Sequence, residues 1–514
     1  MPAQYTEEKE ADSDVLELTE AVTPEILPKW RVLLLNLSWY GVSLMLLVMS
    51  VEVIPSQMRV LVGERYKGRW LGGLVAAGAV ITFFLSPIIG MKSDRLQSRY
   101  GRRRPVMITA TFFLCIGLIG MAFSAPELEI PLDPEVVETN NITGTCEVDL
   151  VHVRCSAYNN ASLPHILEQE NGVAVQGTIK LPEKKVQNPE MDVNTPSSKG
   201  SLGLYVVFYL VVTSAFASVT VPYNALIADK SHPSQRGFNS GVMGAMILLG
   251  NLSGAGIGIC LMKIGIFSTY GCMIGVILLC ILITCLTTSE TPGKNPGEPL
   301  GFGTIFCGFW QPLTDHDFRW VFLTRFLMQQ GVSTVTAFLE YWLSDMVNLP
   351  NCWTPQTSVG LLLIPLLSAA AICSVLCGIL SDRLGRRKPL VITSALLMCG
   401  TSCVLAFIRG SYAYYIAFVM SFFFGLGFGS FQSVDFAIVM DILPAERDKA
   451  KDIAVWHQAL VLPQALATPI GGMVLDIFEH VNCEIGLGYI ILFLMTSSYF
   501  FLSGAFVLKI RGVR

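Results

Sequence analysis

The feature that most restricts the fold is a series of twelve apolar runs, each of about 20 residues, along a chain of 514 residues. A run of that length crosses a bilayer as one α-helix, because helices satisfy their own backbone hydrogen bonds in lipid. Charged residues make up 14% of the chain, against about 25% in soluble proteins. We therefore expect an all-α polytopic membrane protein with helices over 32–54, 70–90, 105–125, 202–227, 238–262, 267–288, 319–345, 356–380, 389–409, 411–439, 452–475 and 486–508.

A short charged motif occurs twice, each time between two apolar runs. Gly-Met-Lys-Ser-Asp-Arg at 90–95 continues to Gly-Arg-Arg-Arg-Pro at 101–105, and it returns as Gly-Ile-Leu-Ser-Asp-Arg-Leu-Gly-Arg-Arg-Lys-Pro at 378–389. Asp382 follows Asp94 by 288 positions, as Glu340 follows Glu52. The simplest explanation is a duplicated six-helix unit, with a substrate path between the two halves.

The repeat also predicts the domain organisation. We expect a first half over 31–288, a linker over 289–318 and a second half over 319–508, with an acidic tail at 1–30 and a short tail at 509–514. Lys and Arg residues gather on the side of the tails and the linker, so the positive-inside rule makes that side cytosolic. The membrane is either the plasma membrane or an endomembrane of a eukaryotic cell.

One loop, 126–201, is much longer than its counterpart in the second half and lies on the opposite side. It contains two glycosylation sequons, at Asn141 and Asn160, which fits an extracellular or lumenal position. It also contains Cys146 and Cys155, a candidate disulfide whose pairing stays open.

Composition and motifs exclude several classes of function. A net charge of −4 gives no basic field for nucleic acid. The chain has no phosphate-binding Gly loop, paired metal motif or nucleophile elbow, so we expect no enzyme, no cofactor and no metal. The expected partners are the lipid bilayer and a small-molecule solute with protons, and the expected state is a monomer.

The doubled pattern Gly-x-x-x-Asp-Arg-x-Gly-Arg-Arg resembles the signature of the major facilitator superfamily. The resemblance implies the major facilitator fold, with two pseudo-symmetric six-helix halves that alternate access to a central site. The longer stretch 93–105, with Pro-Tyr-Asn-Ala-Leu-Ile-Ala-Asp at 222–229 and Val-Leu-Pro-Gln at 461–464, resembles the proton-coupled sucrose and disaccharide transporters, which are related to the glycoside-pentoside-hexuronide symporters. Two acidic features of these relatives are absent: Thr213 replaces a fourth-helix aspartate, and the second helix lacks a sodium-binding pair. If an ion drives transport, its site lies elsewhere.

Charged residues at the cytosolic helix ends predict a gate. Asp94 or Asp382 can pair with nearby arginines and with a helix N-terminus, forming a latch that breaks as the halves rock. The alternative is that the arginines only fix the orientation. We also expect pairs within each half, Asp229 with Arg236 and Asp441 with Arg447. The gate candidates are Gly90, Asp94, Arg95, Gly101, Arg102, Arg103, Asp229, Arg236, Gly378, Asp382, Arg383, Gly385, Arg386, Asp441 and Arg447.

Ionisable residues inside a span are candidates for proton coupling. Asp435 has no acidic counterpart, because the repeat aligns it with Tyr223. We expect Asp435 to pair with His457, either to handle protons or as a structural bond between helices. Glu52 and Glu340 form a symmetric pair near the outer interface, where they either serve an outer gate or are simply solvated.

Polar and aromatic residues at middle depth are the substrate candidates, on the first, fourth, seventh and tenth helices that line the cavity in the superfamily. Amides bond hydroxyl groups and aromatic rings stack on sugars, although the same residues also bond helices together. Arg325 either faces this cavity or extends to the cytosolic boundary. The candidates are Asn36, Trp39, Tyr40, Tyr223, Asn224, Arg325, Gln329, Gln330 and Gln432.

These patterns predict a secondary transporter that moves a small polar solute, a sugar as the best guess, by proton symport. One alternative is a transporter or uniporter for another solute, such as an amino acid, an organic anion or a lipid-like molecule. Another is a non-transporting receptor or scaffold with the same fold. The retention of the charged motif in both halves favours a protein that moves.

Overall fold

The computed structural model describes residues 24–62, 67–125, 200–290, 308, 310–347, 349, 355–409, 412–443, 449–479 and 486–513. Within these ranges the expected all-α fold with twelve long helices is confirmed. The gate candidate Arg447, the two sequon asparagines and the two cysteines of the long loop lie outside the described residues.

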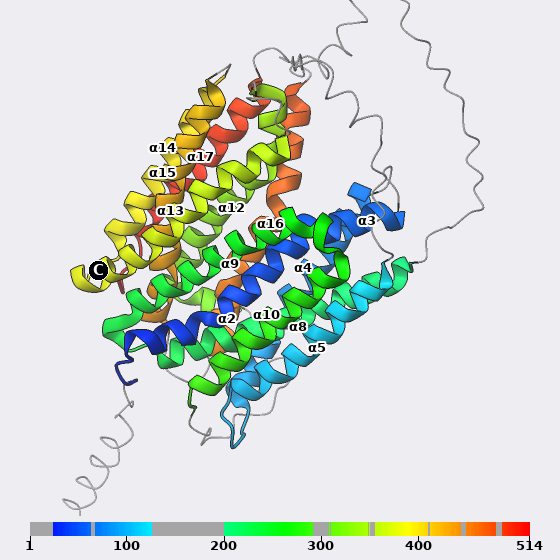
Figure 1. Cartoon of the computed structure of the whole chain (residues 1–514). Helices are drawn as coiled ribbons and strands as arrows, with labels where there is room; N and C mark the ends of the chain where they lie inside the picture. Colours follow the sequence, from blue (N-terminus) through cyan, green and yellow to red (C-terminus); the bar gives the residue numbers. More distant parts are fainter. Residues whose placement is uncertain are drawn as a thin grey trace, which may run out of the picture.

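The first six-helix half begins with a helix made of three segments, namely α2 (Lys29–Leu47), a π-helical turn (Val48–Val53) and α3 (Ile54–Val62). It continues with α4 (Lys67–Arg95), α5 (Arg104–Ser124), α8 (Leu202–Lys230), α9 (Arg236–Ile264) and α10 (Ile266–Thr287). The second half comprises α12 (His316–Met346), α13 (Pro355–Leu384), α14 (Lys388–Phe407), α15 (Ala413–Ile442), α16 (Lys449–Glu479) and α17 (Leu487–Val507). Figure 1 shows the two sets as two groups of helices, with α9 and α13 side by side between them.

Eleven of these helices, counted in the described part of the chain, are long and apolar enough to cross a membrane. The exception by composition is α12, which is 31 residues long and carries Arg319, Arg325, Glu340 and Asp345. α12 packs against α16 and α17 inside the second half, and of these four charged side chains Arg325 is buried. A buried charge inside a membrane span is a candidate functional position.

The first helix is longer than expected and irregular. It runs past residue 54 to Val62, through a π-helical turn that contains Glu52. Pro55, in the first turn of α3, has no N–H to donate to the preceding turn, which explains why the regular α-helical pattern is interrupted there.

The two copies of the charged motif adopt similar turns. Gly101 and Gly385 both have positive φ, 102° and 58°, a conformation that favours glycine. The next helices, α5 and α14, each carry a proline in the first turn, where the missing N–H costs nothing. We call the side of the molecule with residues 96–103 and 385–387 the hinge end.

The halves meet chiefly where α4 packs against α16 and α9 packs against α13 and α15. Glycines allow this close approach: a Cβ atom on Gly90 would lie 2.8 Å from the carbonyl oxygen of Ala450, and one on Gly378 would meet the carbonyl oxygen of Gly237. The Ser374 hydroxyl also donates to the Gly241 carbonyl between α13 and α9, at 3.0 Å. The small residues of the repeated motif therefore lie at the interface between the halves.

Candidate functional site

Asp94, at the end of α4 in the first half, contacts the first turn of α16 in the second half. Its carboxylate accepts from the backbone N–H groups of Ala450 and Lys451, at 3.2 and 3.1 Å. The N-terminus of a helix has free N–H groups and a partial positive charge, so it favours a carboxylate. We call this interaction the Asp94 contact.

Asp382 makes the equivalent interaction in the opposite direction. From the end of α13 in the second half, it accepts from the backbone N–H groups of Gly237 and Phe238 in the first turn of α9, at 2.8 and 2.7 Å. We call this the Asp382 contact. Each half thus supplies one acid and one helix start, and both contacts cross the interface.

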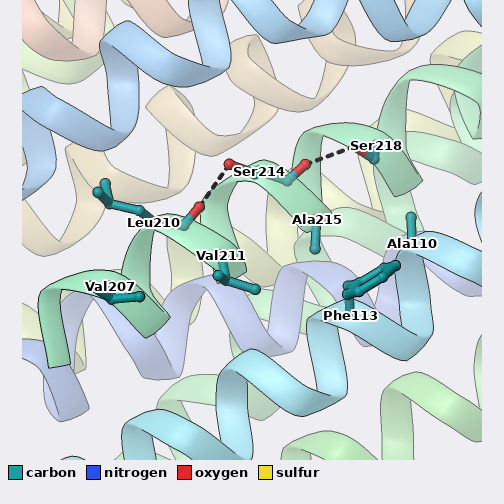
Figure 2. Close-up of a pocket in the computed structure, with 8 residues that line it drawn as sticks. All are labelled: Ala110, Phe113, Val207, Leu210, Val211, Ser214, Ala215 and Ser218. Atoms are coloured by element: carbon teal, nitrogen blue, oxygen red, sulfur yellow. Dashed lines mark hydrogen bonds between the residues drawn. The ribbon is translucent and has the colours of Figure 1, made fainter. Parts of the chain in front are cut away.

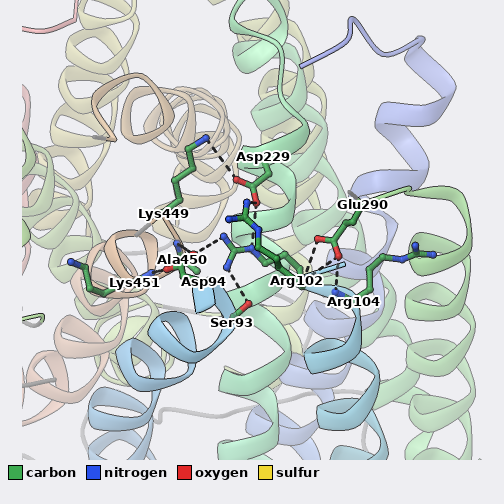
Figure 3. Close-up of polar contacts among 10 residues, drawn as sticks. Ser93, Asp94, Arg102, Arg104, Asp229, Glu290, Lys449, Ala450 and Lys451 are labelled. Atoms are coloured by element: carbon green, nitrogen blue, oxygen red, sulfur yellow. Dashed lines mark hydrogen bonds and ion pairs between the residues drawn. The ribbon is translucent and has the colours of Figure 1, made fainter. Parts of the chain in front are cut away.

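Arginines and a further acid, Asp229, surround the Asp94 contact (Figure 3). Arg103 pairs with Asp94 at 2.6 Å, with both side chains fully buried, and with Asp229 at 3.3 Å. Burial lowers the pKa of Arg103, but the carboxylates of Asp94 and Asp229 outweigh it, so the net shift is upward. Lys449 lies 3.8 Å from Asp229 across the interface, and Arg102 lies 3.7 Å from it.

The matching cluster near Asp382 corrects the expected pairing of the gate. Arg236 does not pair with Asp229 of its own half; it contacts Asp441 of the other half, at 2.9 Å. Asp441 also pairs with Arg387, at 3.0 Å. The physical reason is that α9 begins at the interface, so the Arg236 side chain reaches the end of α15 more easily than the end of α8.

Arg387 is a functional candidate that the sequence reasoning missed. It is buried and takes the position that Arg103 takes in the first copy, whereas the expected residues Arg383 and Arg386 lie exposed, and Arg95 is half-buried at the end of α4. Aligning Arg387 with Arg103 through the glycine at 101 and 385 would have found it.

Glu290, just beyond α10, is a second residue that was missed. It accepts from the backbone N–H groups of Arg103 and Arg104 at the start of α5, at 3.1 Å for each closest pair. Its carboxylate lies against Gly101, where any Cβ atom would collide with it. Burial raises the pKa of Glu290, although the two N–H groups act against this shift. Because α5 and α10 belong to one half, this contact does not cross the interface.

A buried ion pair lies inside the second half. Arg325 of α12 bonds Asp435 of α15, and both side chains are at least 93% buried. The guanidinium group lies over the ring of Trp456 of α16, 3.6 Å from the ring centre. The expected pairing of Asp435 with His457 was therefore wrong: His457 is buried one position after Trp456, and the partner of Asp435 is Arg325. Helical rise predicted that His457 and Asp435 lie at similar depth in the membrane. It does not show in which direction the His457 side chain points.

Three of the substrate candidates bond neighbouring helices. Asn36 donates to Asn239 of α9 at 2.5 Å, and the Tyr223 hydroxyl donates to the Leu35 carbonyl of α2 at 2.7 Å. The Tyr40 hydroxyl bonds Ser253 of α9 at 3.0 Å. These side chains hold helices of the first half together, although Oδ1 of Asn36 is buried without a hydrogen-bond partner among the described residues.

Other candidates keep buried polar atoms without a hydrogen-bond partner among the described residues. These atoms are both amide atoms of Gln330, Oδ1 of Asn224 and Nε1 of Trp39, whose ring packs against Tyr223. Gln329 and Gln432 are half-buried. Buried polar groups are rarely left unpaired, so such atoms indicate places for water or a ligand.

The symmetric glutamates lie away from the hinge end. Glu340 is exposed in the second part of α12, 24 residues beyond the start of that helix at His316. Glu52 lies in the π-helical turn of the first helix, and its side chain is outside the described part.

A groove of about 460 Å³ runs between α5 and α8 (Figure 2). Its two hydroxyl groups are turned onto the backbone, since Ser214 donates to Leu210 and Ser218 donates to Ser214. Phe113 and Val207 on its rim are exposed. The lining comes from the first half alone and is apolar, so this groove suits lipid better than a polar solute.

The fold and these contacts define a multi-pass membrane protein built from two related six-helix halves. The family model of the Major Facilitator Superfamily matches residues 197–450 and 321–512, which together are more than half of the chain. The chain belongs to the major facilitator superfamily, whose members transport small-molecule solutes. This finding confirms the resemblance seen in the repeated motif.

Sucrose transport protein SUT1 of Oryza sativa, in the japonica and indica subspecies, is 39% identical over 56 residues. The match spans 11% of this chain and 10% of the length of those relatives. It fits the suggested sugar-transporter branch.

Solved structures show the same fold over nearly the whole chain. The human organic anion transporter MFSD10 aligns with a TM-score of 0.64 and 14% identity, over 94% of this chain and 100% of that one. The E. coli fucose:proton symporter FucP gives 0.60 and 12%, over 94% and 98%. The proton:xylose symporter XylE gives 0.59 and 15%, over 94% and 95%. At these identities the likeness concerns the fold.

Proposed function

We propose that this protein is a secondary transporter that moves a small, uncharged polar solute, with a sugar as the best candidate, together with protons. The observation that carries the proposal is a buried pair with no net charge, Arg325 and Asp435, together with buried amide atoms of Gln330 and Asn224 that have no hydrogen-bond partner in the described part of the chain. Amides both donate and accept, as hydroxyl groups do, so they match a polyol. The short match to sucrose transporters and the fold of FucP and XylE support this choice.

An organic anion, the solute in the name of MFSD10, is the second candidate. It would need a free cation in the protein interior, and the charge of Arg325 is balanced by Asp435. An anion could bind Arg325 only after Asp435 is protonated. The uncharged solute needs no such step.

The Asp94 and Asp382 contacts support alternating access. Both cross the interface at the hinge end, and both would break if the halves rocked apart there. We infer that they stabilise the state closed at the hinge end, and that the hinge end faces the cytosol because basic residues gather there. A receptor without transport would have no need for a pair of breakable contacts.

Purified protein in liposomes tests the proposal. Labelled sugars, amino acids and organic anions are offered with and without an inward proton gradient. We expect a sugar to accumulate only with the gradient. Uptake of organic anions in its place would refute the uncharged solute, uptake without a gradient would refute proton coupling, and no uptake of any compound would favour the receptor.

Asp435→Asn then tests the proton site. It should abolish accumulation driven by the gradient and preserve exchange of solute across the membrane, because exchange needs no net proton movement. Asp345→Asn is a matched control on α12, since Asp345 accepts from the Tyr489 hydroxyl away from the buried pair. Accumulation that survives Asp435→Asn would show that the proton site is elsewhere.

A further inference from the structure

Three helices of the second half meet at one buried cation. Arg325 comes from α12, its carboxylate partner Asp435 from α15, and the ring that it covers, Trp456, from α16. Phe436, next to Asp435, packs on the same indole with ring centres 5.5 Å apart. The guanidinium group is therefore held between a carboxylate and an aromatic face.

The charged neighbours of this pair are few. Arg325 is the ionic partner of Asp435, and His457 of α16 lies within electrostatic reach of Arg325. The other large contact of Arg325 in the described structure is the face of Trp456. If Asp435 lost its charge, Arg325 would lose its ionic partner and keep its contact with Trp456 as the strongest remaining attraction.

Trp456 stands close to the Asp94 contact along the same helix. Ala450 and Lys451, whose N–H groups bind Asp94, precede it by six and five residues, about 9 Å and 8 Å of helical rise. The four residues between, Asp452, Ile453, Ala454 and Val455, are almost fully buried. A packed, regular helix moves as a rigid unit, so a displacement at Trp456 reaches the first turn of α16.

We propose that Trp456 is a positioning residue that transmits the charge state of Asp435 through the first two turns of α16 to the Asp94 contact. With Asp435 charged, Arg325 and Trp456 hold α16 where its first turn meets Asp94 of the other half. With Asp435 neutral, Arg325 shifts, the indole follows, and the two N–H groups lose their alignment with the carboxylate. This inference rests on the proposed function, because it assumes that Asp435 gains and loses a proton.

The described residues of the first half contain no equivalent of this link. Tyr223 takes the position of Asp435, and its hydroxyl donates to a backbone carbonyl of α2. The start of α9, at Gly237 and Phe238, is therefore not expected to respond directly to a buried charge. The two symmetric contacts differ in what controls them.

Amide hydrogen exchange on the full-length protein in detergent tests the link and needs no solute. Asp435→Asn imitates the neutral acid. We expect it to speed exchange at Ala450 and Lys451 by at least about fivefold, the lower range of allosteric coupling, and by less at Gly237 and Phe238. In a Trp456→Leu background, Asp435→Asn should no longer change exchange at the start of α16.

Trp342→Leu is the matched control, since Trp342 is a fully buried tryptophan of α12 that packs against Phe493 and has no cation over its ring among the described residues. In that background the effect of Asp435→Asn should persist. Trp456→Phe keeps an aromatic face and should retain part of the effect, which covers the case in which Trp456→Leu does not fold. An unchanged effect in both Trp456 variants would overturn the link, as would no effect of Asp435→Asn in the parent protein. A failure of proton-driven uptake with this exchange pattern intact would instead refute the proposed function.

Discussion

Removing the charge from each interface acid should open the hinge end, and the two effects should add. The changes are Asp94→Asn, Asp382→Asn and the double variant. Only interactions that break on opening count toward this equilibrium. For Asp94 these are the two bonds to α16, because its partner Arg103 belongs to the same half and stays with it.

The magnitude follows from the bonds that are lost. Each acid accepts two N–H bonds from a helix start, and asparagine keeps an oxygen acceptor but no charge. A charged hydrogen bond contributes about 1.5 kcal/mol at the low end of its range, so each single change should favour opening by about that amount, or tenfold. The acids lie in separate contacts, so the double variant should reach about 3 kcal/mol, or a hundredfold.

Labelling by a water-soluble maleimide measures the opening. Ala450→Cys places a thiol at a fully buried position under the Asp94 contact, and the parent protein gives the background from native cysteines. Glu290→Gln is the control, since Glu290 also accepts two N–H bonds at the hinge end but within one half. It should leave the labelling rate unchanged.

Two results would refute this reasoning. One is a double variant that labels no faster than the single variants, because the contacts would then not share one rocking motion. The other is faster labelling with Glu290→Gln, because the loss of a carboxylate at any helix start would then have the same effect, whether or not it crosses the interface. A second readout separates stability from opening: Asp94→Asn should lower the melting temperature more than Asp382→Asn, since it also weakens the fully buried pair with Arg103.

Three further predictions concern single residues. Because burial raises the pKa of Glu290, the folded state holds this proton more tightly, so stability should fall as pH rises from about 4 through the raised pKa. Glu290→Gln should flatten this dependence in melting curves, and identical curves would contradict it. Gln330→Ala should raise the KM for the solute at nearly unchanged melting temperature, because the Gln330 amide has no hydrogen-bond partner among the described residues. Asn36→Ala should lower the melting temperature, through the lost bond to Asn239. The reverse pattern would exchange their roles. Gly90→Ala should speed the labelling of Ala450→Cys, since its Cβ atom would lie 2.8 Å from the Ala450 carbonyl oxygen; slower labelling would be evidence against the close approach.

The sequence was sufficient for the fold because length and apolar character alone decide which segments cross a bilayer. The sequence did not predict where the first helix ends. That helix passes through a π-helical turn and continues to Val62. Periodicity does not detect such a turn. Counting apolar runs also predicted α12 as a span, although its charged residues leave it less apolar than the eleven described helices that meet the length and composition of a membrane span.

The site was harder to predict, for two physical reasons. A duplicated chain offers each acid two equivalent sets of partners, so the repeat could not reveal that Arg236 reaches Asp441 of the other half. Helical rise gives depth but not direction, so Asp435 was assigned His457 at similar depth when Arg325 points toward it. The sequence alone did not indicate a role for Trp456, because that role depends on the Arg325 guanidinium group, which belongs to another helix.

The reciprocal arrangement of the two acid contacts has a consequence for assembly. Each half offers one acid and one helix start, and the bonds between an acid and a helix start form only across the interface. Two polypeptides divided within 291–307 would keep Glu290 on the first fragment and the start of α12 on the second. The two coexpressed fragments should therefore associate in the membrane and restore uptake. Two copies of a single fragment whose acid is changed to asparagine should not restore it.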